Sequence, residues 1–146
     1  MCRAITRAYY REAAGALLVY DVSSRDGFEE LQTWLDAVRG STTNRSLTVT
    51  LVGNKNDRPD EDREVSRTEG EEFARDHGLL FFETSAKTGM NVHRAFLATA
   101  EAVMRKLESG DIDMSNPAQG VRRGNRVYES SADSASLLAQ DDDFGG

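Results

Sequence analysis

Two short polar segments carry residue types that can recognise a nucleotide base. The first is Asn54-Lys55-Asn56-Asp57 and the second is Ser85-Ala86-Lys87. A carboxylate at Asp57 can accept two parallel hydrogen bonds from one edge of guanine, from its ring N–H and its amino group. Adenine lacks both donors on that edge, so it would leave the carboxylate unpaired at a cost of several kcal/mol.

The neighbours of Asp57 have types that suit the same ligand. The aliphatic stem of Lys55 can lie along the plane of a base, and the amide of Asn54 can join adjacent loops. A small residue at Ala86 would let its backbone N–H approach a carbonyl such as guanine O6. Each segment alone is also compatible with an ordinary polar turn, with Asn91 as the N-cap of a following helix. Two such segments at the ends of adjacent strands coincide much less often.

Three short apolar runs must position these segments, and they have the composition of strands buried on both faces. They lie at 16–20, 47–52 and 79–82, with helical patterns between them. This alternation indicates parallel strands joined by right-handed crossovers. The fold class is therefore α/β, with three parallel strands and flanking helices. Ligands bind at the carboxyl ends of such strands, which here are 21–23, 53–57 and 84–87.

Three helices are expected to follow these strands, after a short opening helix over 2–10. The first should stop at Gly40. The second opens with a capping box at Ser66–Glu69 and runs to His77, with Gly78 after it. The third ends at Gly110. The first and third carry apolar stripes at helical spacing: Phe28, Leu31, Trp34, Leu35 and Val38, then Ala95, Phe96, Thr99, Ala100, Val103, Met104 and Leu107.

Length and charge limit the classes of protein. The 146 residues suffice for one domain, over 1–112, followed by an acidic tail over 113–146 whose composition is typical of disorder. The net charge of −7 and the pI near 4.9 argue against binding to nucleic acid or anionic membranes. A single cysteine, Cys2, excludes an internal disulfide and is typical of a reducing intracellular setting.

The sequence resembles the Rab family of small GTPases, the vesicle-traffic branch of the Ras-like superfamily. The resemblance extends over about residues 3–112. The motifs that carry it are Ile5-Thr6-Arg7-Ala8-Tyr9-Tyr10-Arg11, Gly15-Ala16-Leu17-Leu18-Val19-Tyr20-Asp21, Trp34-Leu35, Val52-Gly53-Asn54-Lys55-Asn56-Asp57 and Glu83-Thr84-Ser85-Ala86-Lys87-Thr88. It implies a partial Ras-like P-loop NTPase fold in which the family's first three strands are missing.

The resemblance also implies roles for individual residues. Six would bind guanine: Asn54, Lys55, Asp57, Ser85, Ala86 and Lys87. In that arrangement Asp57 reads the base, the two lysines pack against it, Asn54 fixes the loops, and Ser85 supports them while Ala86 presents its N–H. A second set, Ile5, Tyr9 and Tyr10, resembles the second half of switch II, where Rab regulators and effectors dock.

Several family motifs are missing from the sequence. It contains no Gly-x-x-x-x-Gly-Lys-Ser/Thr segment for phosphates, no switch I threonine for Mg²⁺ and no Asp-x-x-Gly-Gln segment for the attacking water. The resemblance therefore implies an N-terminally truncated form. We expect weak or absent binding of GTP, GDP and Mg²⁺, and no GTPase activity of the chain alone. The alternative is a non-catalytic interaction module that competes for Rab regulators or effectors.

The expected location follows from the same resemblance. Rab proteins usually end in one or two prenylated cysteines, whereas this sequence ends in Asp141-Asp142-Asp143-Phe144-Gly145-Gly146. No direct membrane anchor is therefore expected. The chain is expected in the cytoplasm, in association with endosomal or Golgi membranes.

Overall fold

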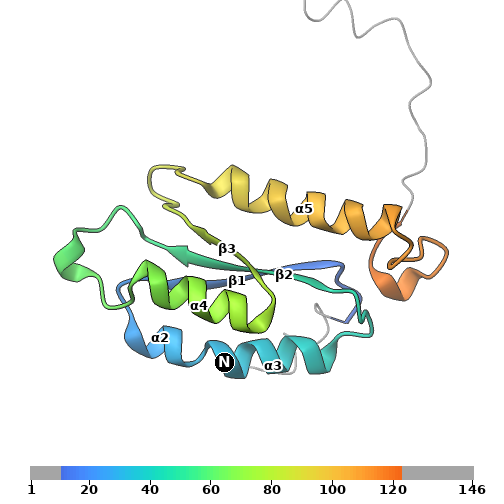
Figure 1. Cartoon of the computed structure of the whole chain (residues 1–146), viewed down its shortest axis with the longest axis horizontal. Helices are drawn as coiled ribbons and strands as arrows, with labels where there is room; N and C mark the ends of the chain where they lie inside the picture. The colour runs from blue at the N-terminus through green and yellow to red at the C-terminus, as the bar shows by residue number, and fades with distance from the viewer. Residues whose placement is uncertain (1–10, 123–146) are drawn as a thin grey trace, which may run out of the picture.

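The computed structural model describes residues 11–122. The opening helix expected over 2–10 and the tail from 123 onward lie outside these residues. The elements in order are β1 (Gly15–Asp21), α2 (Arg25–Glu29), α3 (Leu31–Ser41), β2 (Thr48–Asn54), η1 (Asp60–Asp62), α4 (Arg67–His77), β3 (Leu80–Glu83), α5 (Val92–Glu108) and η2 (Pro117–Gln119), as shown in Figure 1.

The strands form a parallel sheet in the order β1-β2-β3, which confirms the predicted α/β class with three parallel strands. In this register Asp21 lies opposite Asn54, and Gly53 lies opposite Glu83. The carboxyl ends of the strands thus meet at one edge of the sheet. Figure 1 shows α5 on one face of the sheet, and α2, α3 and α4 on the other. None of the helices within 11–122 combines the length and apolar character needed to cross a membrane.

The central strand β2 forms the middle of the core. All its residues before Asn54 are buried, and Leu51 is 0% exposed. On one face, the hydroxyls of Thr50 and Thr99 lie 2.7 Å apart, and Thr99 also donates to the Ala95 carbonyl. This chain of hydrogen bonds satisfies polar groups between β2 and α5 that would otherwise be costly to bury.

The first helical pattern is interrupted, and its predicted end at Gly40 is wrong. The pattern divides into α2, which Ser24 caps through a bond from the Gly27 N–H, and α3, which passes through Gly40 and ends at Ser41. Gly40 does not have a positive φ, and the helix stops where Thr42 becomes extended. Three residues of the expected stripe, Leu31, Leu35 and Val38, are buried.

The expectations for the second helix are confirmed. Ser66 and Glu69 form both bonds of the capping box, and Gly78 ends α4 with φ of 66° in the left-handed region. That conformation favours glycine because it has no Cβ.

The expected stripe of the third helix is only partly buried. Ala95 and Thr99 face the sheet, but Phe96 is 60% exposed and Met104 is 54% exposed. These two side chains line a groove of about 540 Å³ between α5 and the β1 side of the sheet. The helix itself ends at Glu108, two residues before Gly110.

The start of the expected tail lies against the domain. Within 113–122 the chain forms η2, and the Asn44 side chain donates to the carbonyls of Ala13 and Gln119. Asn44 is 1% exposed. These bonds join the segment before β1 to the segment after α5.

Gly70 is expected to be intolerant of a side chain. A Cβ at this position in α4 would lie 2.5 Å from Tyr20 Oη and 2.7 Å from ring carbons of Phe81. We expect Gly70→Ala to lower the free energy of unfolding by about 1–3 kcal/mol through overpacking. Alanine is otherwise favoured over glycine in helices by about 0.5–1 kcal/mol.

Gly40 supplies the matched control in α3, because a Cβ there would meet no atom within 4 Å. Gly40→Ala should raise the free energy of unfolding by about 0.5–1 kcal/mol. Urea denaturation of both variants measures the difference. Two shifts of the same sign would contradict this account of Gly70.

Candidate functional site

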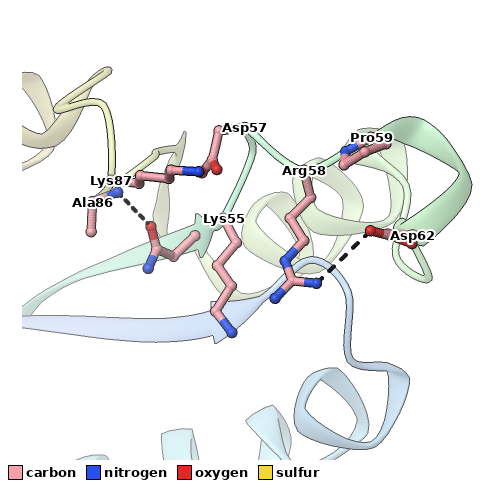
Figure 2. Close-up of a pocket in the computed structure, with 8 residues that line it drawn as sticks. Lys55, Asp57, Arg58, Pro59, Asp62, Ala86 and Lys87 are labelled. Carbon is pink, nitrogen blue, oxygen red and sulfur yellow. Dashed lines mark hydrogen bonds and ion pairs between the residues drawn. The ribbon is translucent and has the colours of Figure 1, made fainter.

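A pocket of about 470 Å³ lies at the carboxyl edge of the sheet (Figure 2). Two loops form its walls, one after β2 and one after β3. Its lining consists of Asn54, Lys55, Asp57, Arg58, Pro59, Asp62, Ala86 and Lys87. Five of the six residues that the sequence analysis assigned to guanine are in this set, and Ser85 lies directly behind them.

Asn54 joins the two walls of the pocket. Its Oδ1 accepts a hydrogen bond from the Ala86 N–H at 3.1 Å, drawn as a dashed line in Figure 2, and another from the Thr84 hydroxyl at 3.2 Å. Backbone bonds run in parallel, from the Asn56 N–H to the Thr84 carbonyl and from the Thr84 N–H to the Gly53 carbonyl. The Ala86 N–H is thus engaged within the protein, and a ligand carbonyl at this position would share or replace that contact.

Ser85 orients the carboxylate of Asp57. Ser85 is 0% exposed, and its Oγ donates to Asp57 Oδ1 at 2.6 Å. The same Oγ accepts from the Thr88 N–H at 3.1 Å, so the direction of the hydroxyl is fixed. The bond from Ser85, aided by the positive charges of Lys87 and Arg58, lowers the pKa of Asp57. The exposed Asp57 therefore presents an ionised acceptor to the pocket at neutral pH.

Lys55 has an unusual backbone conformation. Its φ is 67°, in the left-handed region that side chains with a Cβ rarely adopt. Its Nζ lies 2.6 Å from Oδ2 of Asp21, the last residue of β1. Asp21 is itself held by bonds from the N–H and the hydroxyl of Ser23. The stem of Lys55 is therefore directed from β2 across to β1.

The ion pair between Asp21 and Lys55 should make stability dependent on acid pH. Burial by itself would raise the pKa of Asp21, but the hydrogen bonds from Lys55 and Ser23 lower it to about 2. This value lies below the pKa of about 3.9 for an unfolded aspartate. The stabilisation is therefore fully present above about pH 4 and is lost as pH falls towards 2.

The comparison that isolates this effect is wild type against Asp21→Asn, because other acidic groups such as Glu69 titrate in both proteins. The difference in unfolding free energy between them should be largest at pH 6 and should shrink as the pH approaches 2. Denaturation curves across this range measure it. A difference that does not change with pH would contradict the assignment of the pair.

Several contributors to the site were not predicted from the sequence. Arg58 and Pro59, just before η1, and Asp62, its last residue, also line the pocket, with an ion pair of 3.8 Å between Arg58 and Asp62. Asp21 was expected only as a strand end, and its contact with Lys55 was not predicted. The residues assigned to switch II, Ile5, Tyr9 and Tyr10, lie outside the described residues.

Parallel strands with a polar pocket at their carboxyl edge define the α/β class of ligand-binding domains. Within this class, a family model for the Ras family matches residues 2–105, and the chain belongs to that family. Ras-family proteins are small GTP-binding proteins, which bind GTP or GDP with Mg²⁺ and act through regulators and effectors.

The described residues fit the base of such a ligand better than its metal ion. The pocket offers an oriented carboxylate, a backbone N–H and two lysine stems. Among residues 11–122, no group of three or more His, Cys, Asp or Glu side chains gathers to hold a metal ion.

Proposed function

We propose that this chain is a guanine-nucleotide-binding protein of the Rab branch, acting in intracellular vesicle trafficking. Family membership supports nucleotide binding, and the Rab-like motifs of the sequence favour this branch. The observation that carries the base assignment is the Asp57 carboxylate, which buried Ser85 orients beside the pocket. The guanine-binding set is Asn54, Lys55, Asp57, Ser85, Ala86 and Lys87.

The chemistry proposed for this site is recognition of the base. Asp57 accepts from the ring N–H and the amino group of guanine, while the stems of Lys55 and Lys87 cover the ring. The Ala86 N–H donates to O6. These contacts involve about 11 base atoms, which at about −0.3 to −0.5 kcal/mol per atom corresponds to a dissociation constant in the millimolar range.

The test compares two nucleotides that differ only in the base. We expect 5′-GMP to shift the amide NMR signals of Asp57, Ala86 and Lys87 with a millimolar dissociation constant. We expect 5′-AMP to bind at least about tenfold more weakly, because it leaves the carboxylate without donors. Equal binding of both, or shifts confined to other residues, would overturn the proposal.

We also propose that the chain is cytoplasmic and is recruited to endosomal or Golgi membranes through Rab regulators and effectors. The resemblance of its motifs to Rab proteins supports this location. Imaging of the tagged chain with endosomal and Golgi markers tests it. A signal that overlaps neither marker would contradict the proposed recruitment.

A further inference from the structure

Arg63 contacts its own segment, the loop after β2 and the end of β3, and it does not line the pocket. Its Nε donates to the Val65 carbonyl at 2.7 Å, and its Nη1 donates to Asn56 Oδ1 at 3.0 Å. Its Nη2 forms an ion pair with Glu83, the last residue of β3. Arg63 is not among the residues that line the pocket. Its guanidinium therefore links the loop after β2 to the end of β3 without reaching the ligand space.

Asn56 is the one residue of 54–57 that does not line the pocket. Its side-chain oxygen accepts from Arg63, and its backbone N–H donates to the Thr84 carbonyl at 3.0 Å. The two residues on either side, Lys55 and Asp57, do line the pocket. Asn56 is thus held by Arg63 and Thr84 on the side away from the pocket, while its two neighbours line the pocket.

The anchor that holds Asn56 is well shielded from water. The side chains of Arg63 and Glu83 are 20% and 5% exposed, whereas those of Arg67 and Glu71 in α4 are 66% and 49% exposed. Shielding strengthens the attraction between the charges, and the arginine fork fixes direction as well as distance. An exposed pair such as Arg67–Glu71 contributes little.

The conformation of Lys55 requires such an anchor. A lysine with φ of 67° is held there only if the surrounding contacts over-determine it. Two contacts hold this segment: Lys55 forms an ion pair with Asp21, and Asn56 accepts a hydrogen bond from Arg63.

We propose that Arg63 is a positioning residue for the pocket. Through Asn56 it fixes the backbone that carries Lys55 and Asp57, and through Glu83 it ties that backbone to β3. The effect of Arg63 on guanine binding rests on the proposed function, whereas its effect on the backbone of residues 55–57 does not.

Three variants and one control test this role. Asn56→Ala removes the acceptor and leaves the Arg63–Glu83 pair in place. Arg63→Lys keeps a charge for Glu83 but loses the planar fork that also reaches Asn56. The double variant Asn56→Ala/Arg63→Lys completes a cycle. Arg67→Gln removes an exposed ion pair and serves as the control.

The first measurement is amide hydrogen exchange at residues 55–57, with the amides of β2 as an internal reference. We expect exchange to rise about 10- to 100-fold in Asn56→Ala and in Arg63→Lys, the range for loss of one hydrogen bond to a charged group. The exchange rate of the double variant should be no higher than that of either single variant, and the rate of Arg67→Gln should equal that of wild type. The Arg63–Glu83 ion pair stays intact in Asn56→Ala. This variant therefore tests whether the bond from Arg63 to Asn56 fixes the backbone at 55–57, even if the other variants fail to fold.

Exchange at residues 55–57 in Asn56→Ala that equals wild type, or rises only as much as in β2, would overturn the positioning role. The second measurement is binding of 5′-GMP, which should weaken in the two single variants and stay unchanged in Arg67→Gln. If wild type does not prefer 5′-GMP to 5′-AMP, the proposed function fails while the exchange result still decides the role of Arg63.

Discussion

Replacing Asp57 with asparagine is expected to change the preferred base from guanine to xanthine. Guanine presents two donors on the edge assigned to Asp57, whereas xanthine presents one donor and one carbonyl. A carboxylate complements the first pattern and an amide complements the second. Since each bond to a charged group contributes about 1.5–3 kcal/mol, we expect Asp57→Asn to weaken 5′-GMP binding about 10- to 100-fold.

Titrations with 5′-GMP and 5′-XMP, followed by NMR, measure this exchange of preference. Asp62→Asn is the matched control, because Asp62 lines the same pocket and its carboxylate forms an ion pair with Arg58, at 3.8 Å. It should leave the preference for guanine unchanged. A similar loss of 5′-GMP binding in both variants would indicate that the charge of the pocket matters, and not the bond from the base to Asp57.

Leu51→Ala is expected to have the largest effect on stability. Leu51 is 0% exposed in the central strand and belongs to the cluster that contains Tyr20, Val22 and Leu31. Truncation removes buried apolar surface and leaves a cavity, so the free energy of unfolding should fall by about 2–5 kcal/mol. For a domain whose total stability is about 5–15 kcal/mol, this loss brings it close to unfolding.

The control lies in the neighbouring strand. Val19 in β1 is 56% exposed, so Val19→Ala should change the unfolding free energy by no more than about 0.5 kcal/mol. Thermal or urea denaturation compares the two variants. Similar losses would mean that the face of β1 carrying Val19 is covered in solution.

Local patterns in the sequence were sufficient for most of the fold. The three apolar runs became β1, β2 and β3, and the capping box of α4 formed as predicted, because an apolar run and a capping box can each be recognised from neighbouring residues. The predicted helix end at Gly40 was wrong because glycine favours a helix end where its φ is positive. Gly40 does not have a positive φ, and α3 continues to Ser41. The exposure of Phe96 was not predicted because its side chain lines the groove between α5 and β1, whereas the helical spacing alone places it with the residues that pack on the sheet.

For the candidate site, the sequence predicted which segments meet but not the contacts that hold them. Residues of the two polar segments converge because the carboxyl ends of parallel strands share an edge, which the alternation of elements already implied. The contacts that hold the segments could not be predicted, because they join positions far apart in the sequence. Asp21 meets Lys55 because the register of β1 and β2 places Asp21 opposite Asn54, and Arg63 meets Glu83 across 20 residues of sequence.

The parallel register has a consequence for how the chain folds as it is synthesised. Gly15 pairs with Thr48, and Thr50 pairs with Leu80, so each strand pair closes a loop of about 30 residues. Neither of these two pairs can form from a local hairpin, and contacts of this range slow folding. β2 lacks its second neighbouring strand until β3 has been made, and one of its faces stays uncovered until α5, which ends at Glu108, has been made. Nearly all of 11–122 must therefore leave the ribosome before the central strand is covered, and until then its apolar side chains are available to chaperones and to other chains.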